Sequence, residues 1–135
     1  MTLLEIQERL YTFAALPANW DQQKATPPNT VAIETAWKIA KLSVSRFQFN
    51  PTDCVPSTNG GIALVWVHPV NQDRYADIEC TNDVNVYACA SSKEHELLEE
   101  WQVPDFSVPI IGYTQRSLDE SVSRIKKFMQ TGFLE

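Results

Sequence analysis

The chain has 135 residues, of which 44% are hydrophobic and 21% charged, and this composition excludes a disordered or low-complexity protein. Its formal net charge is −6, and residues 51–113 hold ten Asp/Glu against two Lys/Arg. That excess opposes nucleic-acid binding and suits a basic partner, although solubility is the commoner reason for such a bias. The length fits a single domain covering residues 1–135.

The sequence also predicts a cytoplasmic location. Cys54, Cys80 and Cys89 are odd in number and show no Cys-X-X-Cys spacing, so we interpret them as buried, reduced thiols. The first ten residues carry three charged side chains and no apolar core of a signal peptide. No run of 18 apolar residues occurs, so we expect no membrane span.

Two helices are predicted in the first fifty residues. Thr2 and Glu5 have the spacing of a capping box, and apolar residues recur at helical intervals over residues 3–14, before Pro17. A second run with apolar steps of three and four residues predicts the longest helix, over residues 30–47.

The middle of the chain predicts an antiparallel meander of three or four strands, at about 53–56, 61–68, 74–80 and 84–90. The second of these is apolar on both alternating faces, which predicts a central strand covered on each side. The third alternates between apolar and polar residues, so one of its faces is expected to lie on the core. That face consists of Ala76, Ile78 and Cys80, and the opposite face of Tyr75, Asp77 and Glu79.

In the last third of the chain, an irregular segment is followed by a strongly periodic one. Residues 92–113 are expected to form a long excursion, in which Glu94–Trp101 has the pattern of two helical turns before Pro104. A second capping-box spacing at Ser117 then starts a periodic run that ends before Gly132 and predicts a C-terminal helix. The fold class is therefore α+β, with two N-terminal helices, the antiparallel sheet and a C-terminal helix packed on one sheet face.

Few residues have the spacing of a catalytic site. Asp77 and Glu79 lie two apart on one strand face, close enough to share a metal or to raise one pKa, but a solvated strand face is the interpretation that we favour. The only histidines, His68 and His95, have no ligand pattern around them. Phosphate-binding and hydrolase motifs are missing too, so we expect no catalytic, metal or cofactor site.

The loop Asn19-Trp20-Asp21 places a large aromatic residue between two short polar ones. The structural interpretation is that Trp20 fills the gap between the helices and the sheet, while Asn19 and Asp21 bind local backbone amides. The functional interpretation makes Trp20 an anchor for a partner. Of the other tryptophans, Trp66 is expected in the core, and Trp101 at a surface edge.

These features resemble a family of small uncharacterised bacterial proteins over about residues 16–87. The shared pattern is Asn-Trp-Asp, a Pro pair, a helix, a Gly-Gly-Ile turn before an apolar strand that ends in Trp, and a strand of the Ile-Glu type. The resemblance implies a shared fold and a bacterial cytoplasmic origin, and it carries no assigned activity or cofactor. Its positions in this chain are Asn19, Trp20, Asp21, Pro27, Pro28, Pro56, Gly60, Gly61, Ile62, Trp66, Ile78 and Glu79.

The sequence favours a non-enzymatic module that binds another protein or forms a homodimer, through the free sheet face or residues 97–113. One alternative is a small-molecule binding protein or enzyme with a pocket between Trp20, Trp66 and Glu79. Another is an acidic inhibitor of the immunity type, which requires the ten acidic residues of 51–113 to form one contiguous face.

Overall fold

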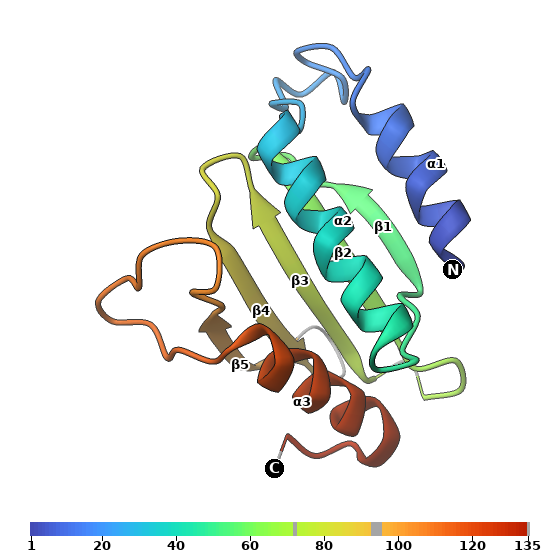
Figure 1. Ribbon diagram of the computed structural model, residues 1–135, viewed down its shortest axis with the longest axis vertical. Helices are drawn as coiled ribbons and strands as arrows, with labels where there is room; N and C mark the ends of the chain where they lie inside the picture. Colours follow the sequence, from blue (N-terminus) through green and yellow to red (C-terminus); the bar gives the residue numbers. More distant parts are fainter. Residues whose placement is uncertain (72, 93–95, 135) are drawn as a thin grey trace.

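Three helices lie on one face of a five-stranded antiparallel sheet in the computed structural model, which describes residues 1–71, 73–92 and 96–134 (Figure 1). The helices are α1 (Leu3–Phe13), α2 (Thr30–Ser45) and α3 (Leu118–Thr131). The strands are β1 (Asp53–Pro56), β2 (Gly61–Val67), β3 (Tyr75–Thr81), β4 (Val86–Ser91) and β5 (Leu97–Gln102). They pair in chain order, so the predicted α+β class and antiparallel meander are confirmed.

The helix ends follow the predicted caps with one difference. Thr2 and Glu5 form both hydrogen bonds of the capping box that begins α1. At α3 the Ser117 hydroxyl accepts from the amide of Glu120, but the Glu120 carboxylate turns to Arg116 instead of reaching back to the cap. Gly132 ends α3 in the left-handed conformation, with φ of 80°.

The hydrophobic core lies between the helices and the inner sheet face. Alternate residues of β2, β3 and β4 point into it, and the face predicted for β3 is confirmed. The prediction of a central strand covered on both sides is wrong, because β2 lies second from the edge and the three helices cover only one of its faces (Figure 1). Its outward residue Val65 is nevertheless only 8% exposed, which accounts for the misleading apolar pattern.

The sheet has one strand more than predicted, and this strand changes the interpretation of residues 92–113. Leu97–Gln102 forms β5 on β4, with a register shift beside Ser91, where two helical turns were expected. Trp101 is 0% exposed, so its predicted place at a surface edge is also wrong. The sequence pattern does not indicate a strand here, because the charged Glu99 lies on the same helix side of β5 as the buried Trp101. Ion pairs with Arg116 and Arg124, which are distant in the sequence, balance the charge of Glu99 in this position.

Among the described residues, no helix has both the length and the apolar character required to cross a bilayer.

Candidate functional site

In the part of the chain that the structure describes, no helix covers the sheet face that is turned away from α1, α2 and α3, and we call it the open face (Figure 1). Cross-strand pairing assembles it in rows, one running from Val65 through Asp77 and Cys89 to Glu100. Its principal members are Val55, Ala63, Val65, Val67, Tyr75, Asp77, Glu79, Tyr87, Cys89 and Glu100. The open face therefore combines carboxylates, tyrosines and an apolar strip.

A hollow of about 310 Å³ lies in the open face over β3, β4 and β5. One wall consists of Tyr87 and Tyr113, whose ring centroids lie 5.3 Å apart with their planes inclined by 43°. The complete lining is Asp77, Glu79, Tyr87, Ala88, Cys89, Glu100 and Tyr113. Three carboxylates thus border one hollow with two aromatic rings.

Two of the three carboxylates of the hollow accept hydrogen bonds, and none of the three takes part in the ion pairs found among the described residues. Asp77 accepts from the hydroxyl of Tyr75 at 3.1 Å, and Glu79 accepts from the hydroxyl of Ser57 at 3.2 Å. Burial raises the pKa of Asp77, and the nearby charge of Glu100 raises it further, against the hydrogen bonds from Cys89 and Tyr75. A positive group placed here would relieve this excess of negative charge.

The hollow is poorly suited to nucleophilic chemistry. Burial, reinforced by the charge of Asp77, raises the pKa of the Cys89 thiol to about 12, so the thiolate that would act as a nucleophile is scarce at neutral pH. Burial also raises the pKa of the Tyr75 hydroxyl. Cys89 is only half-buried and faces this hollow, which corrects its interpretation as a core thiol, whereas Cys54 and Cys80 are buried.

His68 adds no general base to this site. His68 lies in the turn after β2, where its Nδ1 accepts from the amides of Val70 and Asn71. His95 lies outside the described residues. Within the described part of the chain, no group of three or more His, Cys, Asp or Glu has the arrangement to hold a metal ion.

The side chains of the loop Asn19-Trp20-Asp21 form hydrogen bonds with nearby backbone groups. The Asn19 side chain accepts from the amide of Lys24 at 2.6 Å, and Asp21 accepts from the amides of Gln23 and Ala25. Trp20 donates from Nε1 to the carbonyl of Thr26 at 3.2 Å. These contacts support the structural interpretation for Asn19 and Asp21. Trp20 is half-buried and does not belong to the described hydrophobic core, so its predicted place between the helices and the sheet stays a prediction.

Two turns of the sheet, at residues 59–61 and at Asn82, lie beside this loop. Thr26 forms a parallel bridge with Asn59, and Asn82 accepts from the amide of Asn29 at 2.8 Å. A Cβ on Gly61 would lie 2.3 Å from the carbonyl oxygen of Cys80, so only glycine fits there without displacing backbone. These contacts therefore join the N-terminal loop to two turns of the sheet.

The pocket predicted between Trp20, Trp66 and Glu79 does not form. Trp66 is buried on the helix side of β2, where its ring stacks on Phe49 with centroids 5.2 Å apart. Glu79 lies on the opposite side of the sheet. The three side chains therefore belong to separate surroundings.

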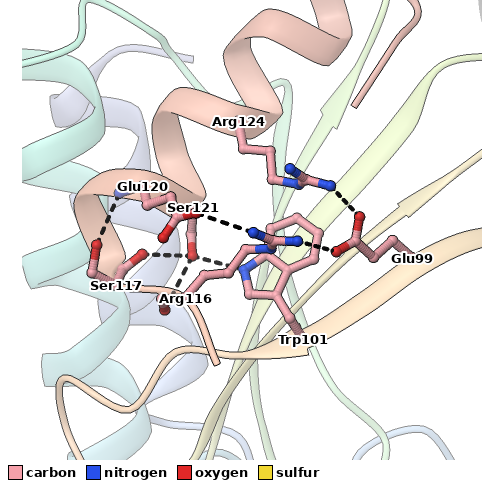
Figure 2. A network of polar contacts seen from close by, with 7 residues as sticks. All are labelled: Glu99, Trp101, Arg116, Ser117, Glu120, Ser121 and Arg124. Carbon is pink, nitrogen blue, oxygen red and sulfur yellow. Dashed lines mark hydrogen bonds and ion pairs between the residues drawn. The ribbon is translucent and has the colours of Figure 1, made fainter. Parts of the chain in front are cut away.

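A second charged cluster, which we call the α3 clamp, lies on the helix side of β5 (Figure 2). Arg116 and Arg124 both pair with Glu99, the former at 2.6 Å, and their guanidinium carbons each lie 5.6 Å from the centroid of the Trp101 ring. The indole of Trp101 donates to the hydroxyl of Ser121 at 2.7 Å. No local sequence pattern predicts this cluster, because its members lie up to 25 positions apart and share no motif.

The α3 clamp also bears on the distribution of acidic residues. Glu99 faces the helices, and Asp105 accepts from the amide of Leu118 at the start of α3, while Glu100 lies on the open face. The acidic residues of 51–113 therefore do not form one contiguous face. The negative patch on the open face consists of Asp77, Glu79 and Glu100.

One apolar hollow of about 260 Å³ opens on the helix side, between α1 and α2. It includes Tyr11, 83% exposed, and Glu34 at its rim. Its apolar lining resembles ordinary helix packing, and it provides matched positions for control substitutions.

Comparison with known proteins finds no match: no protein-family model, curated protein or solved structure corresponds to this chain.

Proposed function

We propose that this protein is a non-enzymatic interaction module whose open face binds a basic segment of a partner protein. The observation that carries the proposal is the patch of Asp77, Glu79 and Glu100, which takes part in none of the ion pairs among the described residues and lies beside tyrosines and an apolar strip. Tyrosine is enriched in protein interfaces, and complementary charge steers association and selects partners.

Charge also decides between a partner and a second copy of the chain. In a two-fold homodimer the same patch meets itself, so the carboxylates of both copies would approach each other. The net charge of −6 adds to that repulsion. The open face therefore favours a basic partner over self-association.

An enzymatic role has less support from the same face. The raised pKa of Cys89 leaves little thiolate, and the described lining of the hollow contains no histidine that could activate the thiol. The raised pKa of Asp77 follows from burial and crowding, which a basic ligand would relieve as well.

The test is affinity capture from native-host lysate with the wild type and two charge-reversed variants, each checked for folding by circular dichroism. Glu79→Lys/Glu100→Lys reverses two charges on the open face, and Glu8→Lys/Glu34→Lys reverses two exposed charges on the helix side. We expect the first variant to lose a partner that the second retains.

Binding strength should also fall as salt is added, because exposed charges are screened beyond about 10 Å at 0.1 M ionic strength. A partner lost equally from both variants, or retained by both, would contradict docking on the open face. Loss from the helix-side variant alone would move the docking surface to α1 and α2.

A further inference from the structure

We infer that the hollow in the open face is an anchor site for an arginine side chain of the partner. This inference rests on the proposed function and narrows it from a basic surface to one residue type at one place. The carboxylates of Asp77, Glu79 and Glu100 surround a space that is bordered on one side by the rings of Tyr87 and Tyr113.

The α3 clamp shows how this chain itself accommodates arginine. There the guanidinium groups of Arg116 and Arg124 lie over the face of Trp101 and reach the carboxylate of Glu99 (Figure 2). The hollow offers the same two kinds of partner, aromatic faces and carboxylate oxygens. A guanidinium entering it would make the contacts that the α3 clamp makes internally.

The geometry favours arginine over lysine. A guanidinium is planar, stacks on aromatic rings and donates to carboxylates through a fork of N–H groups, whereas the lysine ammonium is a compact and strongly hydrated charge. The inclined rings of Tyr87 and Tyr113 present aromatic surface beside the carboxylates, which is where a planar cation gains most.

Gln102 positions one of these rings. Its side chain is fully buried, accepts from the amide of Ile110 at 2.7 Å and donates to the carbonyl of Val108 at 3.1 Å. Its backbone amide donates to the carbonyl of Thr114 at 2.8 Å. Gln102 thus fixes the segment that carries Tyr113 against the sheet, and we call it a positioning residue.

The experiment is a titration of isotope-labelled protein, followed by NMR, with three peptides that differ at one residue. The probes are Gly-Ser-Gly-Arg-Gly-Ser-Gly and its lysine and citrulline counterparts, all with blocked ends. Citrulline keeps the shape of arginine without its charge. We expect the arginine peptide to shift the resonances of Tyr87, Cys89 and Tyr113, and the citrulline peptide to bind about tenfold more weakly, as for loss of one charged hydrogen-bonding group.

Two variants test the site itself. Tyr113→Ala should weaken arginine binding severalfold, and its matched control Tyr11→Ala, an exposed tyrosine on α1, should leave it unchanged. Glu100→Gln and Glu34→Gln form a second matched pair, and circular dichroism confirms that each variant is folded. Equal binding of the arginine and citrulline peptides, or shifts scattered over the whole surface, would overturn the anchor site.

The two proposals fail in different ways. If the captured partner is lost from Glu79→Lys/Glu100→Lys while the arginine peptide does not bind, the docking face stands and the anchor site is wrong. If the partner tolerates that double variant, the proposed function fails whatever the peptide does.

Discussion

Glu99 and Glu100 are neighbours in the chain, yet β5 turns them to opposite faces of the sheet and into opposite electrostatic surroundings. Glu99 faces α3, where two arginines neutralise it and lower its pKa through hydrogen bonds and charge, against the effect of burial. Glu100 faces the hollow, where it adds to the negative charge around Asp77. One carboxylate therefore stabilises the fold, and the next leaves charge available for a partner.

The largest loss of stability is expected when the indole ring at the centre of the α3 clamp is removed. We expect Trp101→Ala to lower the free energy of unfolding by about 3 to 5 kcal/mol, because it leaves a cavity under α3 and removes the surface beneath both guanidinium groups. Chemical denaturation measures the loss. Trp101→Phe keeps a ring and forfeits mainly the hydrogen bond to Ser121, so it should cost clearly less; equal losses would show that the ring is unimportant.

The second test removes the carboxylate that both arginines share. Glu99→Gln should lower the free energy of unfolding by about 2 kcal/mol, because it removes the ion-pair partner of Arg124 and leaves Arg116 paired only with the exposed Glu120. The side chains of Arg116 and Arg124 are only 21% and 19% exposed, so water compensates in part. The comparison is Glu120→Gln, whose carboxylate pairs with Arg116 but is 53% exposed and should matter little.

The third test replaces the neighbouring carboxylate, that of Glu100, which lies on the open face. Glu100→Gln should leave the free energy of unfolding within about 0.5 kcal/mol of the wild type, because Glu100 is exposed and takes part in none of the ion pairs among the described residues. The same variant should bind the basic partner more weakly, measured by calorimetry. A large loss of stability with unchanged binding would reverse the roles that we assign to the two residues.

The smallest expected effect concerns pH. Because the pKa of Asp77 is raised in the folded state, its ionisation opposes folding, and this penalty is present at neutral pH and disappears as pH falls below the ordinary carboxyl range. Asp77→Asn should therefore raise the melting temperature slightly at pH 7 and not at pH 3. Glu99 has the opposite sign: its lowered pKa stabilises the fold at neutral pH, and that contribution is lost as pH falls through the lowered value.

Thermal melts of Asp77→Asn and Glu99→Gln between pH 3 and pH 7 check whether each carboxylate stabilises or destabilises the fold when it is ionised. If Asp77→Asn stabilised equally at both pH values, its effect would come from packing rather than charge.

Local signals in the sequence were sufficient for much of the fold. The caps at Thr2 and Ser117 locate two helix starts, and alternation in β3 identifies the face that carries Asp77 and Glu79. These features depend on residues within a few positions of each other, so a pattern can reveal them.

The features that the sequence did not predict depend on residues that lie far apart in the chain. The charge of Glu99 beside the buried Trp101 on the helix side of β5 is balanced by Arg116, which lies just before α3, and by Arg124 within α3, up to 25 residues later. The hollow likewise depends on Tyr113, which reaches the open face only because Gln102 fixes its segment. Such contacts leave no trace in the local order of residues, so neither site could be predicted.

The meander also affects how the chain can assemble during synthesis. Every strand pairs with its neighbour in the sequence, and α2 packs on β2 and β3, which follow it closely. The N-terminal helices and the first three strands can therefore associate in the order in which they leave the ribosome, before α3 exists. Until then Trp101 and Glu99 have no cover, so the last helix completes a domain that has already begun to fold.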